Sequence, residues 1–138
     1  MGAFVLLPGL CSNRRETVEE PLGLKERIHF LTTAEQVDEF LTKNPSAAIF
    51  KAGTCHKTQE TFAHVQAHLE AREDLPLGII RVVEARAASN RVAERTGIPH
   101  ESPQIVLFKD GKAVFDRDNW DITSEALAEG LEAHPARA

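Results

Sequence analysis

The regular alternation of short apolar runs with segments of helical periodicity restricts the possible folds of this chain more than any other feature. The apolar, strand-like runs are residues 29–31, 47–50, 79–83, 104–108 and 112–115. Between the first four runs, and again after the last, apolar residues recur at helical spacing. The predicted order of elements is therefore βαβαβαββα. Because strands joined by a helix pair in parallel through right-handed crossovers, we expect only the final two strands to pair antiparallel.

Local sequence signals mark the ends of these elements. Thr33 begins a capping-box pattern, and Thr123 is the expected N-cap of the last helix. The third predicted helix begins at Ser89 and ends at Gly97, a residue that readily adopts the left-handed conformation of a C-cap. The Asp-Gly pair at residues 110–111 separates the last two strands, and such a pair favours a tight hairpin turn.

This order of elements is that of the thioredoxin fold, an α/β fold with a central mixed sheet and helices on both faces. We assign residues 25–138 to one thioredoxin-like domain, because a chain of 138 residues forms one ordinary domain. Residues 1–24, which include Cys11, are predicted to form a poorly ordered N-terminal extension. Thioredoxin-like folds carry a cis proline just before the first hairpin strand, where this chain has Pro103. A cis bond there would leave the backbone N–H and C=O of Ser102 free to pair with an extended substrate.

The sequence around Cys55 indicates thiol chemistry. Cys55 stands where a strand pattern changes to a helical one, so its sulfur would face the free N–H groups and positive dipole of a helix N-terminus. These groups favour the thiolate, which is the nucleophilic form. A redox Cys-x-x-Cys pair would have its second thiol three positions on, and Thr58 stands there instead. Any disulfide that Cys55 forms must then be resolved by a thiol from elsewhere.

Composition and charge exclude several classes of function. The chain has 16 basic and 21 acidic residues, and its net charge of −5 offers no broad cationic surface to nucleic acid or to anionic lipid. No run of residues is long enough to cross a bilayer. Two cysteines are too few for a secreted disulfide framework, so we expect a reducing, cytoplasmic compartment. His64 and His68 share a helical face, but no third ligand accompanies them, and no metal site is expected.

Four segments of the sequence resemble the monothiol bacilliredoxins, thioredoxin-like proteins of bacteria that make bacillithiol. These segments are Phe50-Lys51-x-x-Thr54-Cys55-x-x-Thr58, His100-Glu101-Ser102-Pro103-Gln104, Lys109-x-Gly111-Lys112-x-Val114 and Arg117-Asp118-Asn119-Trp120-Asp121-Ile122-Thr123. The resemblance extends over residues 26–132, and the His-Glu-Ser-Pro-Gln run is its most specific part. After the cysteine, His56 and Lys57 replace the proline and isoleucine that are usual in the family.

The resemblance implies a monothiol thiol–disulfide oxidoreductase that acts on protein–bacillithiol mixed disulfides. Cys55 would attack the bacillithiol sulfur, release the repaired protein thiol and be freed in turn by a second bacillithiol. Exchange of this kind needs no metal and no bound cofactor, and bacillithiol serves as the co-substrate. The bacillithiol disulfide would pass to a flavin-dependent reductase. The expected partners are bacillithiolated proteins and bacillithiol itself.

The other candidate site residues, all proposed to bind substrate, lie in three segments of the chain. They are Thr54, His56, Lys57, Thr58, Ser102, Pro103, Asn119 and Trp120. Lys57, together with Lys51 and His56, could lower the pKa of Cys55 by charge or orient the malate carboxylates of bacillithiol. The alternative is that these side chains are simply solvated.

Further alternatives apply to the threonines and to the aromatic segment. Thr54 and Thr58 could hydrogen-bond the sulfur, or Thr58 could serve only the first helical turn. Residues 119–121 are expected to open the last helix, whose free N–H groups could bind a ligand carboxylate. For Trp120 we expect a place in the core or as a loop plug in preference to contact with a ligand.

Two other functions would fit the same thiol. One is a non-enzymatic redox sensor in which Cys55 is merely modified, and the other is an adaptor that binds partners at the exposed ledge around Pro103. The pKa of Cys55 distinguishes these classes, because an ordinary value favours the adaptor and a depressed value favours thiol chemistry.

Overall fold

The computed structural model describes residues 24–72 and 74–134 of the chain. A short 3₁₀ helix, η2 (Leu24–Arg27), leads into the first of the strands, which are β2 (Ile28–Phe30), β3 (Ala47–Ala52), β4 (Leu77–Arg81), β5 (Gln104–Lys109) and β6 (Lys112–Asp118). The helices are α1 (Ala34–Lys43), α2 (His56–Glu70), α3 (Arg86–Thr96), the 3₁₀ helix η3 (Asn119–Asp121) and α4 (Ser124–Ala133). This order confirms the predicted alternation of strands and helices.

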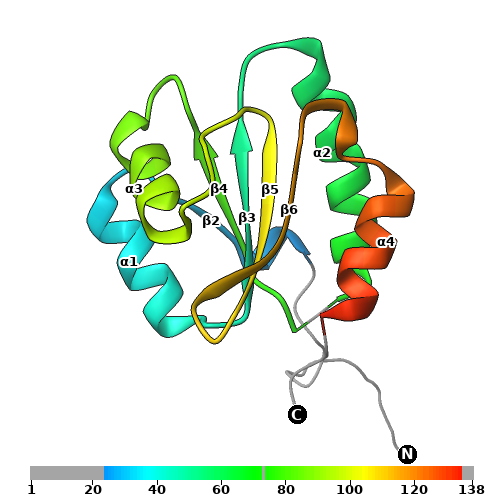
Figure 1. Ribbon diagram of the computed structural model, residues 1–138, viewed down its shortest axis with the longest axis horizontal. Helices are drawn as coiled ribbons and strands as arrows, with labels where there is room; N and C mark the ends of the chain where they lie inside the picture. The colour runs from blue at the N-terminus through cyan, green and yellow to red at the C-terminus, as the bar shows by residue number, and fades with distance from the viewer. Residues whose placement is uncertain (1–23, 73, 135–138) are drawn as a thin grey trace, which may run out of the picture.

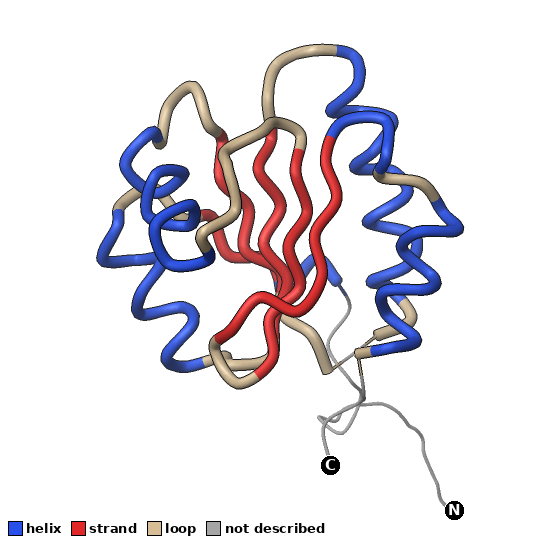
Figure 2. The backbone as a smooth tube through the Cα atoms, in the orientation of Figure 1, coloured by secondary structure: helices blue, strands red, loops and turns tan. Residues whose placement is uncertain are grey.

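The strands of the described region form one mixed sheet in the order β2-β4-β3-β5-β6 (Figure 2). β2 and β3 both pair with β4 in parallel, as the crossover rule predicts. The prediction that only the hairpin is antiparallel is wrong, because β5 also pairs antiparallel with β3, with Gln104 opposite Lys51. Two strands are parallel when the connection between them carries the chain back to the edge of the sheet where the first strand began. Residues 97–103 instead leave the chain at the edge where β3 ends, so β5 runs in the direction opposite to β3.

Helices cover both faces of this sheet (Figure 1). On one face α1 and α3 contribute Phe40 and Val92 to a core that also contains Ile49 of β3. On the other face α2 and α4 enclose a second core, which contains Leu69 and the next residue of β3, Phe50. Consecutive side chains of a strand point to opposite faces. The central strand is therefore buried on both sides, which explains its unbroken apolar sequence.

The local signals for caps and for the hairpin turn are confirmed. Thr33 caps α1 and Thr123 caps α4, and each side chain accepts a hydrogen bond of 3.1 Å from the backbone N–H three residues on. Gly97 ends α3 in the left-handed conformation with a φ of 71°. Residues 110 and 111 have φ values of 56° and 77°, as a tight turn between β5 and β6 requires.

Two predicted boundaries are displaced around β4. This strand covers Leu77–Arg81 and not residues 79–83, because its register is set by pairing with β3. The two valines that follow Arg81 lie in a turn, where the Arg81 carbonyl accepts two backbone hydrogen bonds of 3.0 and 2.8 Å. α3 accordingly starts at Arg86, ahead of the predicted Ser89. A β-branched composition indicates a strand only where a partner strand is available.

The Ser102–Pro103 peptide bond is cis, as the sequence predicts. Cys11 and the predicted extension, apart from residue 24, lie outside the described residues, so those expectations stay as predictions. Within the described ranges, no helix combines the length and the apolar character that a membrane crossing requires.

Candidate functional site

Cys55 occupies the N-cap position of α2, beyond the carboxyl end of the central strand β3. Its backbone is extended, with φ −86° and ψ 169°, and its side chain makes no capping hydrogen bond. The thiol is exposed to solvent. The backbone N–H groups of Lys57 and Thr58, in the first turn of α2, interact with the sulfur, and the Thr58 N–H also donates to the Cys55 carbonyl at 3.0 Å. The structure thus places Cys55 at the helix start that the sequence predicts.

Hydrogen-bond donors around the sulfur lower the pKa of the Cys55 thiol below its ordinary value. The largest contribution comes from the backbone N–H of Thr58, and the Thr58 hydroxyl, 4.0 Å from Sγ, adds to it. The backbone N–H and the positive charge of Lys57 act in the same direction. All of these groups interact more favourably with the thiolate than with the thiol. The lowered pKa favours thiol chemistry over the adaptor function.

Thr58 supports the segment just before Cys55, which the loop of the cis proline approaches closely. Its hydroxyl accepts a hydrogen bond of 3.1 Å from the backbone N–H of Gly53. A Cβ added to Gly53 would lie 3.1 Å from Ser102 Oγ and 3.3 Å from Thr58 Oγ1. Ser102 therefore approaches the chain just before Cys55 so closely that glycine fits best there. The structure brings Thr58, Ser102 and Cys55 to one place, as predicted from the sequence.

Asn119 ties three segments of the site together. Its side-chain Oδ1 accepts a hydrogen bond of 2.8 Å from Nζ of Lys57, and its Nδ2 donates to Oε1 of Glu101 at 3.3 Å. Its backbone N–H donates to the carbonyl of Pro103 at 2.9 Å. Asn119 adopts a left-handed φ of 50°, a conformation that asparagine tolerates better than most residues. Both ends of the amide have protein partners, so the geometry supports positioning of Lys57 and the proline loop by Asn119.

The aromatic segment differs from its prediction. Residues 119–121 form the separate 3₁₀ helix η3, and α4 starts at Ser124 with its first turn capped by Thr123. The expectation that these residues open the last helix is therefore wrong. Trp120 is 56% exposed, so the prediction that it is buried is wrong as well. A 3₁₀ helix of this length shows no hydrophobic repeat, so the spacing of apolar residues in the sequence does not separate it from α4.

Two other predicted residues lie on the surface beside Cys55. The imidazole Nε2 of His56 is 2.8 Å from Oε2 of Glu60 one turn along α2, and both side chains are largely exposed. Thr54 is exposed next to Cys55, and its side chain makes no hydrogen bond to the described residues. The structure places both residues near the thiol without giving either one a contact to it.

Lys51 is buried, although a solvated side chain was one of the alternatives considered for it. Its side chain is 0% exposed, on the face of β3 that α1 and α3 cover. Burial lowers its pKa from 10.5 to about 8. Its Nζ lies 3.2 Å from Nδ1 of His100, which in turn is 2.9 Å from Oγ of Ser89. Sequence reasoning named neither of these partners as a site residue, although strand alternation after Ile49 indicates that Lys51 points inward.

Comparison with known proteins assigns the chain that carries this thiol site to a protein family. The family model described as monothiol bacilliredoxin BrxC matches residues 29–127. The chain belongs to the monothiol bacilliredoxin family. The match covers Cys55 and all the candidate site residues, and it confirms the resemblance found in the sequence. Family and fold together support a thiol redox role for this bacilliredoxin.

Solved structures similar to this bacilliredoxin have the thioredoxin fold. One, described as a candidate oxidoreductase with a thioredoxin fold, is 26% identical with a TM-score of 0.71, and the match covers 78% of this chain and 96% of that one. Mitochondrial thioredoxin 3 from Saccharomyces cerevisiae is 19% identical with a TM-score of 0.64, covering 80% and 98%. A thioredoxin from Fasciola hepatica is 18% identical with a TM-score of 0.61, covering 78% and 99%. The last two show likeness of fold.

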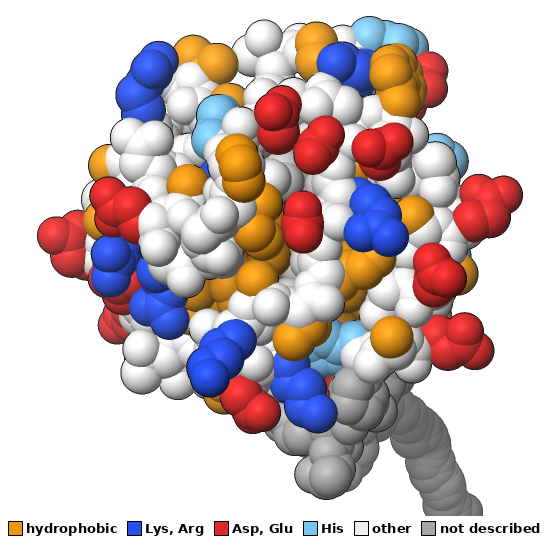
Figure 3. Space-filling model, in the orientation of Figure 1, with side chains coloured by type: hydrophobic (Ala, Val, Ile, Leu, Met, Phe, Trp, Pro, Cys, Tyr) orange, Lys and Arg blue, Asp and Glu red, His pale blue; other side chains and the backbone are white. Residues whose placement is uncertain are grey.

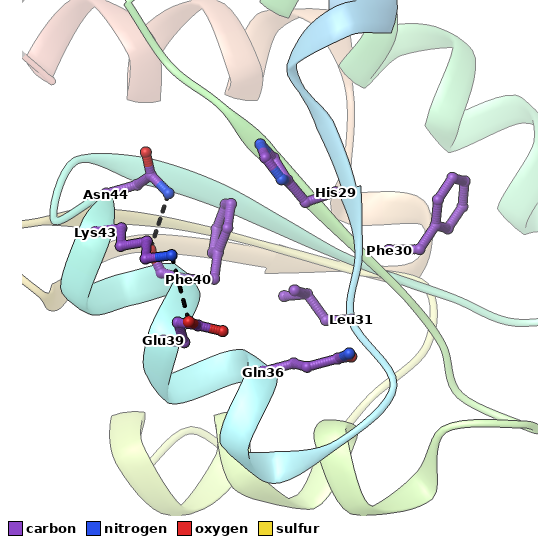
Figure 4. Close-up of a pocket in the computed structure, with 8 residues that line it drawn as sticks. All are labelled: His29, Phe30, Leu31, Gln36, Glu39, Phe40, Lys43 and Asn44. Atoms are coloured by element: carbon purple, nitrogen blue, oxygen red, sulfur yellow. Dashed lines mark hydrogen bonds and ion pairs between the residues drawn. The ribbon is translucent and has the colours of Figure 1, made fainter.

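No cluster of three or more His, Cys, Asp or Glu among the described residues could hold a metal ion. A cavity of about 280 Å³ between β2 and α1 is lined by apolar side chains, by the polar side chains of His29, Gln36 and Asn44, and by the Glu39–Lys43 ion pair of 3.3 Å (Figure 4). Acidic side chains gather on the upper half of the face in Figure 3, where β5 begins and β6 ends.

Proposed function

We propose that this bacilliredoxin removes bacillithiol from protein mixed disulfides through the single thiolate of Cys55. The observation that carries the proposal is an exposed, thiolate-favouring Cys55 at a helix start where Thr58 replaces a second cysteine. Such a site can form a mixed disulfide but has no neighbouring thiol in the described region to close an internal one. We infer that the cycle uses a small thiol from solution, which in this family is expected to be bacillithiol.

Each half of the proposed cycle is one thiol–disulfide exchange. The Cys55 thiolate attacks the bacillithiol sulfur of the mixed disulfide, a new S–S bond forms, and the client protein leaves as its thiolate. A second bacillithiol thiolate then attacks the bacillithiol sulfur held on Cys55. This step yields bacillithiol disulfide and restores the Cys55 thiolate. No net oxidation of the bacilliredoxin occurs, and the disulfide passes to a flavin-dependent reductase.

The geometry supports a place for an extended client segment beside the thiol. Ser102 lies against the cysteine loop, and its backbone precedes the cis proline. Trp120, which follows the Asn119 that contacts Lys57, offers exposed apolar area next to the same site. Lys57 keeps its positive charge close to Cys55, where it would attract a ligand carboxylate. A cytoplasmic location fits this chemistry, since a reducing compartment keeps the lone thiol available.

The direct test is to incubate the full chain with a bacillithiolated client protein and quench with acid before mass spectrometry. We expect a bacillithiol adduct on Cys55 and release of the client thiol, with turnover that requires free bacillithiol. Glutathione at the same concentration is the matched control for the co-substrate. Equal turnover with glutathione would contradict the assignment of bacillithiol, and release of client thiol without an adduct on Cys55 would contradict the monothiol cycle.

A further inference from the structure

A polar cavity separate from the Cys55 thiol lies where β4 leads into α3. Its volume is about 160 Å³, enough for a small group such as a carboxylate or phosphate. The turn after β4, the first turn of α3 and the loop before the cis proline form its walls. The lining residues are Val82, Val83, Arg86, Ser89, Asn90 and His100.

Buried donors outnumber acceptors behind this cavity. Lys51, 0% exposed, carries three N–H donors, and Ser89, 2% exposed, carries one O–H donor. Among the described residues, the acceptor that both side chains meet is Nδ1 of His100, at 3.2 and 2.9 Å. A lysine can only donate, so Nδ1 accepts and the imidazole proton lies on Nε2. One lone pair cannot serve both donors. Because Ser89 lines the cavity, a ligand bound there could accept the hydrogen bond that His100 cannot.

The charge of Lys51 likewise has no counter-ion among the described residues. No described carboxylate forms an ion pair with its ammonium group, and burial alone accounts for its lowered pKa. Burial lowers the pKa of His100 most and the positive charge of Lys51 comes next, while the smaller lowering by Arg86 is outweighed by the opposing effect of Glu101. A buried cation without a counter-ion is strongly unfavourable. An anion in the adjoining cavity would offset this penalty.

The start of α3, which supplies Arg86 and Ser89 to the lining of the cavity, has no side-chain cap. α3 is 11 residues long, and its N-cap is Ala85, whose side chain cannot accept a hydrogen bond from the first turn. α1 and α4 each have a threonine in this role. The uncapped N–H groups of α3 are thus available to a ligand, and the positive end of the helix dipole favours an anion.

We propose that this cavity binds a small oxyanion, the carboxylate or phosphate group of a low-molecular-weight ligand. Ser89 and the first N–H groups of α3 donate to its oxygens, while Arg86 and the ammonium of Lys51 balance its charge. The site is distinct from the thiol chemistry proposed above, and its existence does not depend on bacillithiol.

Binding is tested by titrating the ¹⁵N-labelled full chain with inorganic phosphate, against sodium chloride at matched ionic strength and fixed pH 7. We expect saturable shifts of the amide resonances of residues 86–90, together with a higher pKa of His100 in phosphate, since an anion stabilises the imidazolium. Shifts that do not saturate, or that chloride reproduces, would overturn the proposal.

Two variants locate the bound phosphate. Arg86→Gln alters an exposed side chain and leaves the fold undisturbed, and Lys51→Met removes the buried charge. Each should weaken phosphate binding roughly tenfold, as the loss of one charge-assisted contact predicts. Lys109→Met, which removes an exposed charge at the far end of β5, is the control and should bind as the wild type does. Equal affinity in all three variants would show that the anion is elsewhere.

A final comparison identifies the source of the oxyanion. Succinate is titrated in the same way, and exchange at Cys55 is measured with dithiodiglycolate and with neutral hydroxyethyl disulfide. If phosphate inhibits exchange with dithiodiglycolate but not with hydroxyethyl disulfide, the cavity binds the carboxylate of a disulfide substrate. Binding without inhibition would identify a free anion. Failure of both phosphate and succinate to bind refutes the oxyanion site, whereas the bacillithiol assay tests the thiol cycle separately.

Discussion

The starts of α2 and α3 lie at the same edge of the sheet, on opposite faces. The charged form of a titratable side chain is stabilised at the first and destabilised at the second. At α2 the exposed Cys55 has a lowered pKa because N–H donors stabilise its charged form. Beside α3 the buried Lys51 also has a lowered pKa, but because burial destabilises its charged form. The same direction of shift therefore promotes the thiolate at one site and weakens the ammonium at the other. Solvation by nearby dipoles, and not exposure alone, decides which charge a site favours.

The largest effect is expected from removing the thiol at the start of α2. Cys55→Ser should abolish release of thiol from a bacillithiolated client, because a hydroxyl at neutral pH is not a competent nucleophile for a disulfide. The measurement is the rate of client thiol release in the presence of bacillithiol. Cys11→Ser is the matched control and should keep full activity. Loss of turnover in that control would mean a mechanism with two thiols.

The second largest effect is expected on stability, because the buried charge of Lys51 beside α3 destabilises the folded protein. A pKa of about 8 for Lys51, against 10.5 for an unburied lysine, corresponds to roughly 3 kcal/mol against the charged form. Below pH 8 the folded protein must bury the ammonium, so stability rises as the pH increases from about 8 to 10.5. Lys51→Met should raise the free energy of unfolding at pH 7 by up to roughly 3 kcal/mol in chloride buffer without oxyanions.

Denaturant unfolding of wild type and Lys51→Met at several pH values provides the check. The advantage of the variant should shrink as the wild type loses its buried charge above pH 8. Lys109→Met removes an exposed lysine and should show little change at any pH. An advantage that is the same at pH 7 and pH 10 would indicate better packing of methionine and not relief of a buried charge.

A smaller effect is expected at Thr58, whose hydroxyl supports the cysteine loop. Thr58→Val removes the acceptor of the Gly53 N–H and should lower stability by about 1 kcal/mol. The pKa of Cys55 should rise only partly, because the largest contribution, the Thr58 backbone N–H, remains. Thr58→Ser keeps the hydroxyl and is the control. The pH dependence of thiol alkylation measures the pKa, and a complete return to the ordinary value in the valine variant would contradict this ranking.

The smallest effect is expected from the charge beside the thiol. Lys57→Met should raise the pKa of Cys55, since the positive charge and its attraction for the thiolate are lost. Exchange at neutral pH should then slow only a few-fold, because exposed charges are screened by solvent. Lys112→Met, at the hairpin turn, serves as the comparison. If alkylation profiles of the two variants coincide, Lys57 has no part in activating the thiol.

Sequence reasoning succeeded where the signal is local. Thr33, Thr123 and Gly97 each act through a hydrogen bond or a backbone angle within a few residues, so their types alone predict the helix ends. The position of Cys55 before α2 follows from a change of periodicity at one point in the chain. The cis bond before Pro103 was predicted from the place of this proline in the order of elements.

The failures concern relations between distant segments. The antiparallel direction of β5 depends on where residues 97–103 deliver the chain, which composition does not reveal. Trp120 was expected inside on the grounds of its size, but the 3₁₀ turn that exposes it is set by contacts of Asn119 with Lys57 and with the proline loop. The partners of Lys51 likewise come from α3 and from the loop after it.

Three of the hydrogen bonds of Asn119 have a consequence for the proposed recognition of client proteins. They join the start of α2 to the proline loop before any ligand arrives. A binding surface whose segments are already connected has little conformational freedom left to lose on binding. Most of the conformational entropy lost on binding is then lost by the client segment that carries the modified cysteine. We therefore expect short, mobile client segments to adapt to this surface, while the bacilliredoxin keeps one shape throughout its cycle.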